Sequence, residues 1–450
     1  MSSNRETALE FSAPARERVS LSAYWRLLRG NRNFRRLWMA QIVSELGDWF
    51  YVIAIYTLLL QFTGRARSLG LALVLQVLPQ TLAGPSAGVV NDRVRRRRVM
   101  IAADLLRAAI VVAMLLVRSP SMVWLAYSLL VAETVMAAFF EPARNSVIPN
   151  IVPRDQVIVA NTLGSITWSF DLAIGATLGG VLLAFTGRPT VLVINALSFV
   201  VSALLIRGMK FGEPHAAGAL LRPTSAKSGQ MWGALHAAVD FSPMLDGLRY
   251  LQDRPRLLAT VLVKGGLGLM IGATWVVYAM MGERLFAMHF GNPRRGATLG
   301  MSLLIGARGI GALLGPLVAA RWAGWRESRL RHGILLGFLT AALGVGSLGG
   351  APNVWLAMAC VVVAHCGGSV VWTFSTTMLQ LNSDDQFRGR VFSADLGLCM
   401  AAIAITAYAA STAIDVGVPL RLLAFLTGAA MLIPAAAWGW AQRLWMAPPD

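Results

Sequence analysis

Charged residues are scarce in this chain, and acidic ones are the scarcest. Only 14% of the 450 residues are charged, with 22 Asp and Glu against 40 Lys and Arg, whereas a soluble chain carries about 25%. This shortage argues against a soluble α/β domain, because 56% of the residues are hydrophobic and apolar runs of about 18 residues or more recur along the chain. The composition therefore predicts an all-α membrane protein.

Cysteine is rare, and sequence motifs for metals, nucleotides and catalysis are missing. Cys360, Cys366 and Cys399 fall in predicted membrane helices, at spacings that fit neither a metal site nor a disulfide framework. No GxxxxGK[ST] motif and no nucleophile–base pair is found. We therefore expect no enzyme activity, no metal and no cofactor, and an ion gradient as the energy source.

The net charge of +18 does not indicate a nucleic-acid partner, because the basic residues sit in short loops between apolar runs. With the N-terminus inside, the segments expected in the cytoplasm hold 29 of the 40 basic residues and the outer loops hold eight. The other three lie within spans. This bias predicts a multi-pass protein of a bacterial inner membrane, with both termini cytoplasmic.

Twelve transmembrane helices are expected, in two pseudo-symmetric six-helix bundles. The expected spans are 35–62, 69–91, 99–117, 122–143, 157–186, 189–208, 257–281, 297–320, 332–349, 354–379, 390–413 and 419–441. The expected domains are a cytoplasmic tail (1–34), a first bundle (35–208), a cytoplasmic linker (209–256), a second bundle (257–441) and a cytoplasmic tail (442–450). "FSPMLDGLRYLQDRPRLL" (241–258) in the linker is expected to form an amphipathic surface helix.

The halves also look like weak repeats. "SLGLALVLQVLPQTLAGPSAG" (68–88) resembles "TLGMSLLIGARGIGALLGPLVAA" (298–320) in an early Leu-Gly and a late Gly-Pro pair. "RDQVIVANTLG" (154–164) similarly echoes "DDQFRGRVFSADLG" (384–397). Parallel six-helix repeats are typical of transporters that alternate access around a central site.

Two acids interrupt the first apolar run, "QIVSELGDWFYVIAIY" (41–56). Gln41, Ser44, Glu45 and Asp48 fall on one face of the helix. Because a charge that faces lipid is costly, we expect this face to meet a watery cavity or a partner.

The loop "GVVNDRVRRRRVM" (88–100) resembles the cytoplasmic motif of the major facilitator superfamily. The matching positions include Gly88, Asp92, Arg93 and Arg96. "GDWF" (47–50), "EPARNSVIPNIVPRDQVIVANTL" (141–163) and "RGRVFS" (388–393) are similar to the branch containing the enterobactin exporter and the macrolide efflux proteins. The resemblance implies that Asp92 docks at the start of span eleven, near Arg390, and that a motif arginine meets Glu141 in the outward-open state.

The superfamily fold lines its central cavity with spans one, four, seven and ten, and each carries an ionisable residue here. The predicted substrate-binding or proton-coupling residues are Glu45, Asp48, Glu133, Lys264 and His365, with Asp171 and Arg308 from spans five and eight. Lys264 is expected within reach of Glu45, Asp48 or substrate in at least one state, or else in a static ion pair. Asp104 and Arg107 are expected to form a structural pair.

Span five contains "GATLGG" (175–180), which resembles the Gly-Pro-x-x-Gly-Gly pattern of proton-driven exporters, with Ala176 in place of proline. The glycines favour export, and the missing proline weakens this interpretation. Helix packing alone is the alternative explanation of the glycines.

The resemblance implies a monomeric, proton-driven antiporter that exports a small amphipathic molecule such as a siderophore or a macrolide-like drug. Multidrug resistance would follow from such efflux. The alternatives are a translocator of lysophospholipids or other lipids, and a membrane receptor that transports nothing.

Overall fold

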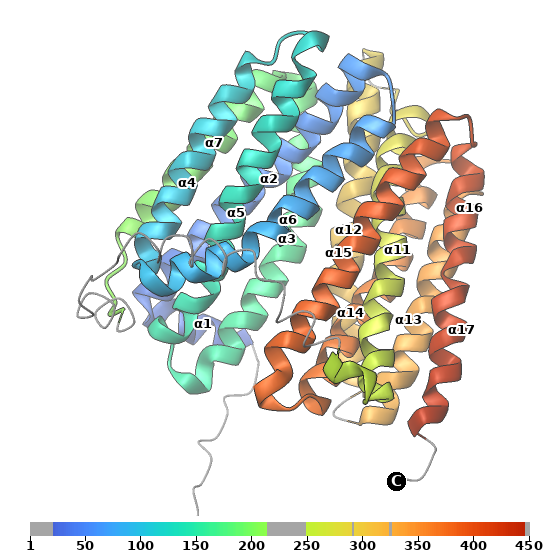
Figure 1. Ribbon diagram of the computed structural model, residues 1–450. Coiled ribbons are helices and arrows are strands. Elements are labelled where there is room, and N and C mark those ends of the chain that lie inside the picture. The colour runs from blue at the N-terminus through green and yellow to red at the C-terminus, as the bar shows by residue number, and fades with distance from the viewer. Residues whose placement is uncertain (1–20, 214–248, 290–291, 324–325, 446–450) are drawn as a thin grey trace, which may run out of the picture.

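The computed structural model describes residues 21–213, 249–289, 292–323 and 326–445 (Figure 1). All regular elements in these ranges are helical, which confirms the predicted all-α class. The α-helices are α1 (Leu21–Gly30), α2 (Arg32–Thr63), α3 (Arg67–Arg93), α4 (Arg96–Ala113), α5 (Val123–Ile151), α6 (Val157–Thr186), α7 (Arg188–Arg207), α11 (Pro255–Arg284), α12 (Pro293–Ala323), α13 (Glu327–Leu348), α14 (Val354–Asn382), α15 (Asp385–Asp415), α16 (Leu420–Ala430) and α17 (Leu432–Ala441).

Eleven of the described segments are long and apolar enough to cross a membrane. The expected second span coincides with α3, a helix of 27 residues that is not among those eleven, so the count of twelve is not confirmed. The last span consists of α16 and α17, which are separated at Met431. Pro434 explains the break, because it has no N–H to bond the carbonyl of Ala430.

Local chemistry sets several helix ends. The side chain of Asn31 accepts a hydrogen bond from the backbone N–H of Phe34 at 2.9 Å and begins α2. Gly64 ends the same helix in the left-handed region (φ 65°), which glycine adopts without strain. Asn353 caps α14 in the way that Asn31 caps α2.

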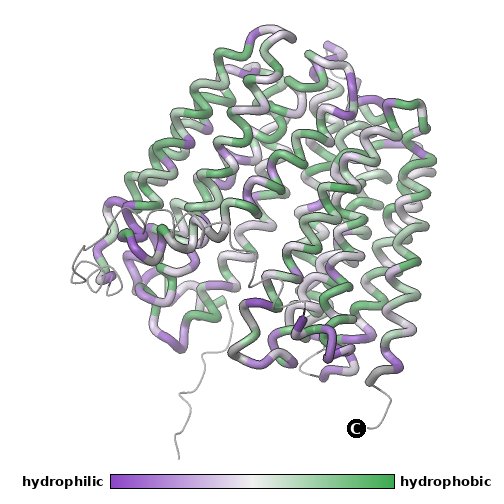
Figure 2. Tube along the Cα trace, viewed as in Figure 1, coloured by the Kyte–Doolittle hydropathy of each residue, from purple (hydrophilic) through white to green (hydrophobic). Residues whose placement is uncertain are grey.

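The helices run between two ends of the molecule. We use "terminal end" for the end where α2 begins and α17 finishes, at the bottom of Figure 1, and "far end" for the end where α2 meets α3. Figure 2 shows apolar residues along the helices and hydrophilic residues gathered mainly at the two ends. Large apolar side chains that stay exposed on the helices, as on a lipid-facing surface, include Val318, Leu343, Ile405 and Ile433.

The helices form two bundles, α2–α7 and α11–α17, whose packing repeats. In the first bundle α2 packs on α6, α3 on α5 and α4 on α5; in the second, α11 packs on α15, α12 on α14 and α13 on α14. Each pair in the second bundle repeats the chain order of its counterpart, six of the described helices later. The packing therefore supports the pseudo-symmetry that the sequence repeats predicted.

The two bundles meet along α6–α12 and α3–α15. These are the four helices that carry the two repeated sequence segments, 68–88 with 298–320 and 154–164 with 384–397. Equivalent helices thus form both seams, as an approximate two-fold relation requires. At the far end of α15, Asp415 accepts hydrogen bonds from the backbone N–H groups of Ala66 and Arg67 at 2.7 and 2.9 Å.

Residues 1–20, 214–248 and 446–450 lie outside the described ranges, and with them most of the predicted linker and surface helix. Residues 249–252 are helical. The expected N-terminal tail contains α1, which buries Ala23 and Leu27 against the start of α2 and α6. The i, i+4 spacing of these two residues gives α1 the apolar face that makes it a helix and not a polar tail.

Candidate functional site

An arginine inside the first bundle binds two of the predicted carboxylates. Arg107 of α4 donates hydrogen bonds from Nε to Glu133 of α5 at 2.7 Å and from Nη2 to Asp48 of α2 at 2.8 Å. Arg107 is 6% exposed and Glu133 is 8% exposed. Both acids therefore face a buried guanidinium within the bundle and not lipid, as their cost in a membrane requires.

Glu45 has an arginine of its own. Arg144 of α5 donates to Glu45 at 3.0 Å and to Glu141 at 2.8 Å. In this structure Glu141 pairs with Arg144, which lies three residues away on the same face of α5. The contact of Glu141 with an arginine of the loop motif is expected in the outward-open state, and it stays a prediction.

Asp171 of α6 adds a further carboxylate next to Glu45. Its side chain is fully buried, and neither of its oxygens has a hydrogen-bond partner among the described residues. The Asp171 carboxyl interacts electrostatically with that of Glu45, whose Oε2 is also buried and unpaired in this part of the structure. The two carboxyls therefore face one another in a low-dielectric site, where two like charges repel.

The predicted pair of Asp104 and Arg107 is not what the hydrogen bonds show. Asp104 accepts a hydrogen bond from Ser202 of α7 at 2.6 Å, while the hydrogen bonds of Arg107 go to other helices. The longer Arg107 side chain also lies over the ring of Phe199, 4.1 Å from its centre. The short and the long side chain of α4 thus connect it to different neighbours.

Lys264 of α11 lies in the second bundle and pairs with Asp395 of α15 at 2.5 Å. Both residues are buried, and the Lys264 ammonium also lies 4.8 Å from the ring centre of Trp372. The predicted contact with Glu45 or Asp48 is therefore not made in this state, because the carboxylate of α15 takes the lysine. The alternative, a static ion pair, fits this geometry, and contact in another state stays a prediction.

Arg308 of α12 and His365 of α14 are buried in the second bundle, at 5% and 8% exposure. The Arg308 guanidinium lies over the ring of Trp275, 3.9 Å from its centre, and His365 meets Tyr278 edge-on. The predicted site residues thus divide into an acidic group in the first bundle and a group of basic side chains in the second.

Aromatic rings lie between these two groups. Trp49, the neighbour of Asp48, stacks on Trp275 of the second bundle with ring centres 6.2 Å apart, and meets Trp168 edge-on at 6.4 Å. These three rings come together at the interface between the bundles.

The loop motif is only partly described. The side chain of Asp92 lies outside the described residues, so its docking is untested. Gly88 has open space where a Cβ would be, and Arg93 and Arg390 are exposed. Arg96 donates to a backbone carbonyl of α5 at 3.1 Å, which holds the loop to its own bundle.

Two glycines of the "GATLGG" segment face α2. A Cβ at Gly175 would lie 2.8 Å from the Cβ of Trp49, and a Cβ at Gly179 would lie 2.8 Å from the Cα of Phe50. Such contacts are too short for any side chain, so the packing interpretation of these glycines is confirmed. Their link to export stays a prediction.

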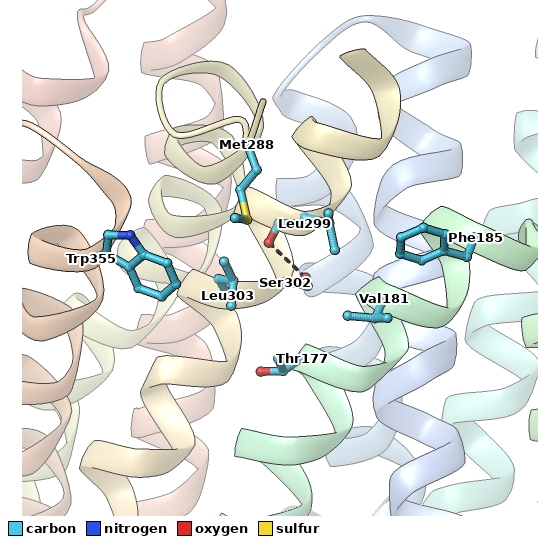
Figure 3. Close-up of a pocket in the computed structure, with 8 residues that line it drawn as sticks. All are labelled: Thr177, Val181, Phe185, Met288, Leu299, Ser302, Leu303 and Trp355. Atoms are coloured by element: carbon cyan, nitrogen blue, oxygen red, sulfur yellow. Dashed lines mark hydrogen bonds between the residues drawn. The ribbon is translucent and has the colours of Figure 1, made fainter. Parts of the chain in front are cut away.

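The third glycine, Gly180, faces α12, where a Cβ would collide with Ser302. Figure 3 shows this seam, with Thr177 on α6 and Ser302 on α12 beside an apolar cavity of about 260 Å³. Phe185, Leu303 and other large side chains line the cavity. It lies apart from the ionisable residues, so it is not part of the charged site.

Sequence reasoning missed the partners of the predicted acids. Arg144 lies in the "EPARNS" segment that carried the resemblance, three residues after Glu141, and this spacing could have indicated the pair. Asp395 is an acid within a span, which the burial cost alone could have assigned to Lys264.

Comparison with known proteins identifies the family. The family described as Major Facilitator Superfamily matches residues 37–407. The chain belongs to this superfamily. The resemblance seen in the sequence is thereby confirmed, and both family and fold are those of membrane transporters.

Three relatives, two of them named for efflux, are similar to this chain. It is 26% identical over 382 residues to the multidrug efflux pump Tap of Mycobacterium bovis (strain BCG / Pasteur 1173P2), covering 81% of this chain and 82% of Tap. It is 28% identical to macrolide efflux protein A of Streptococcus pyogenes over 40% of this chain and 46% of that protein. It is 30% identical to the MFS-type transporter YfiS of Bacillus subtilis (strain 168) over 40% of this chain and 43% of YfiS. The last two matches span less than half of each relative.

Solved structures share the fold. A bacterial homologue of the iron transporter ferroportin in the inward-facing state matches with a TM-score of 0.64 and 16% identity, covering 91% of this chain and 98% of that one. The nucleoside transporter NupG (D323A mutant) matches with a TM-score of 0.65 and 11% identity, covering 91% and 99%. At these identities the likeness is one of fold alone.

Proposed function

We propose that this superfamily member is a proton-coupled secondary exporter that moves a small amphipathic molecule out of the cytoplasm by alternating access. Two relatives named for efflux, Tap and macrolide efflux protein A, support the direction. The proposed substrates are siderophores, macrolide-like drugs or other secondary metabolites. The proposed location is a bacterial inner membrane, with cytoplasmic termini and a monomer as the working unit.

The excess of buried acid over buried base in the first bundle carries the proposal of proton coupling. Arg107 and Arg144 bond to four of the six carboxylates within its expected spans, and Asp104 and Asp171 have no arginine bonded to them among the described residues. The six carboxylates are Glu45, Asp48, Asp104, Glu133, Glu141 and Asp171. Because unpaired charge is costly at membrane depth, surplus carboxylates are suited to carry protons.

Asp48 lies at the edge of this network. Its side chain is 31% exposed, whereas that of its partner Arg107 is 7% exposed. Its Oδ1 is buried without a hydrogen-bond partner among the described residues, so this oxygen can take a proton while Oδ2 keeps its bond to the guanidinium. Asp48 is therefore the proposed entry point for protons, with Glu133 behind the same arginine.

The cross-bundle contacts support alternating access. The stacked pair Trp49–Trp275 lies near mid-membrane, and further cross-bundle contacts follow from there to Asp415 at the far end. A closed far end leaves the terminal end as the route to the acidic site. By the charge bias of the loops this is the cytoplasmic side, the side from which an exporter loads.

The apolar cavity between α6 and α12 favours a second candidate function, lipid translocation. It lies on the seam between the bundles and is lined by apolar side chains of a kind that could hold an acyl chain. In that case lysophospholipid would move without a need for the carboxylates of the first bundle.

Flux measurements test these functions. Purified protein in liposomes is given an imposed pH gradient and a panel of a catecholate siderophore, erythromycin and a lysophospholipid. Export predicts that one of the first two accumulates with the gradient and that a protonophore abolishes this accumulation. Gradient-independent movement of lysophospholipid alone would favour the lipid function.

A further inference from the structure

Arg308 is a buried cation that has no acidic partner among the described residues. It lies near the middle of α12, and its Nε and Nη1 have no hydrogen-bond partner among the described residues. Each of the other cations discussed within the spans has a carboxylate: Arg107 has Asp48 and Glu133, Arg144 has Glu45, and Lys264 has Asp395. An isolated charge at this depth is expensive, so its retention needs a cause.

Four other polar groups around Arg308 are also buried and unsatisfied. Nε2 of His365 has no hydrogen-bond partner in the part of the chain that the structure describes. The Tyr56 hydroxyl lies close to Nε1 of Trp275, and the Tyr278 hydroxyl lies close to Thr274, but neither contact has the geometry of a full hydrogen bond. Tyr56, Tyr278 and His365 lie within electrostatic range of the Arg308 guanidinium, and its plane lies over the Trp275 ring.

The chemistry of these groups selects a negative ligand. An indole N–H and an arginine N–H can only donate, and a tyrosine hydroxyl donates readily to an anion. Buried water could satisfy such donors, but water carries no charge to balance the guanidinium. A carboxylate would do both, because guanidinium and carboxylate form paired, charge-assisted hydrogen bonds.

The position of the group ties it to the transport cycle. Side chains of a helix lean toward its N-terminus, so Arg308 leans toward the far end, where Tyr278 and Tyr56 lie. Tyr56 comes from α2 of the first bundle, and Arg308, Trp275, Tyr278 and His365 come from the second. The group is thus complete only while the bundles are closed at the far end.

We propose that Arg308, with Tyr56, Tyr278 and Trp275, binds the carboxylate of the transported molecule. The proposal rests on the exporter function and narrows its substrate to an amphipathic acid. The carboxylate of this substrate would lie mainly against the second bundle. The stacked Trp49 and Trp275 place an aromatic wall beside the apolar part of the substrate.

A first test needs no ligand. If Arg308 waits for a substrate, then Arg308→Met removes an uncompensated charge and raises the melting temperature of the purified protein by about 2 °C. The matched control, Arg107→Met, removes the cation that pairs with two buried carboxylates, and it should lower the melting temperature. If Arg308→Met lowers the melting temperature as Arg107→Met does, Arg308 is a structural cation and the proposal is wrong.

A second test uses a matched pair of probes, indole-3-acetate and the uncharged indole-3-acetamide, with sodium chloride as the inorganic arm. The melting temperature, followed by the reaction of the buried Cys360 and Cys399 with a thiol-reactive dye, is expected to rise with indole-3-acetate in the wild type. The melting temperature of the wild type is expected to stay unchanged with indole-3-acetamide or with chloride alone, and that of Arg308→Met is expected to stay unchanged with indole-3-acetate. Tyr56→Phe should weaken the response to indole-3-acetate several-fold.

Four results would each overturn the carboxylate site. They are a response to indole-3-acetate that persists in Arg308→Met, an equal response to indole-3-acetamide, a response to chloride alone, and no response of the wild type. None of these measurements involves flux or a pH gradient. A failure here is therefore distinguishable from a failure of proton coupling, which only the flux experiment reports.

Discussion

Trp49 of α2 stacks on Trp275 of α11 with an interplanar angle of 22°, and this contact joins the two bundles near mid-membrane. On one side of the stack, Asp48 directly precedes Trp49 in the sequence and is bound by Arg107 in the acidic network. On the other side, Arg308 lies over Trp275. Asp48 and Arg308 therefore lie on opposite sides of the contact that must open when the bundles rock apart at the far end.

A disulfide across the seam should trap this state. An ideal Cβ on Gly306 of α12 would lie 3.5 Å from the Cβ of Thr177 on α6, which is within disulfide range. It would also lie 2.9 Å from the carbonyl oxygen of Ala173, so the two helices must separate slightly to admit a cysteine there. We expect Thr177→Cys with Gly306→Cys, in a background lacking Cys360, Cys366 and Cys399, to crosslink under oxidation and to lose transport. Reducing agent should restore it.

The two single-cysteine variants are the controls for this crosslink, and each should transport with or without oxidant. Full transport by the oxidised, crosslinked double variant would mean that the far end need not open.

Replacing Arg107 should lower the stability of the first bundle. Arg107→Met leaves Asp48 and Glu133 as buried carboxylates without a cation, and breaking a buried ion pair in this way costs about 3–5 kcal/mol. Thermal unfolding in detergent should show a large fall in melting temperature. Adding Asp48→Asn and Glu133→Gln should recover much of the loss, because these residues are coupled through one guanidinium.

An Arg107→Met protein with wild-type stability would show that the two acids find other partners. The Asp48→Asn/Glu133→Gln protein with Arg107 intact serves as the reference for the triple variant.

The Lys264–Asp395 pair should behave as a structural unit. Lys264→Met and Asp395→Leu should each destabilise the protein, since each leaves one buried charge alone. The double variant should regain stability and keep transport. A stable double variant that has lost transport would contradict a static role, and would revive the prediction that Lys264 meets Glu45, Asp48 or substrate in another state.

Much of the fold could be predicted because the length and apolar composition of membrane helices identify them in the sequence. The apolar runs, the loop charges and the repeated segments gave the helical class and the paired bundles. Helix ends were harder: α5 continues through Pro142 and Pro149 to Ile151, past the expected end at 143, since neighbouring helices support it beyond the apolar run.

The site could be predicted only in part. The burial cost of charge correctly singled out Glu45, Asp48 and Glu133 as residues that avoid lipid. Which cation each one meets depends on helix rotation and side-chain reach, which spacing along one helix does not reveal. Arg107 illustrates this, because it is three residues from Asp104 yet bonds to α2 and α5.

Proton coupling through the acids of the first bundle is tested most directly by separating exchange from accumulation. Asp48→Asn and Glu133→Gln proteins in liposomes are compared with wild type, with substrate on both sides and then with substrate outside and an imposed pH gradient. The account predicts that the variants still exchange substrate but no longer accumulate it with the gradient. Gradient-driven accumulation at the wild-type level in both variants would contradict it.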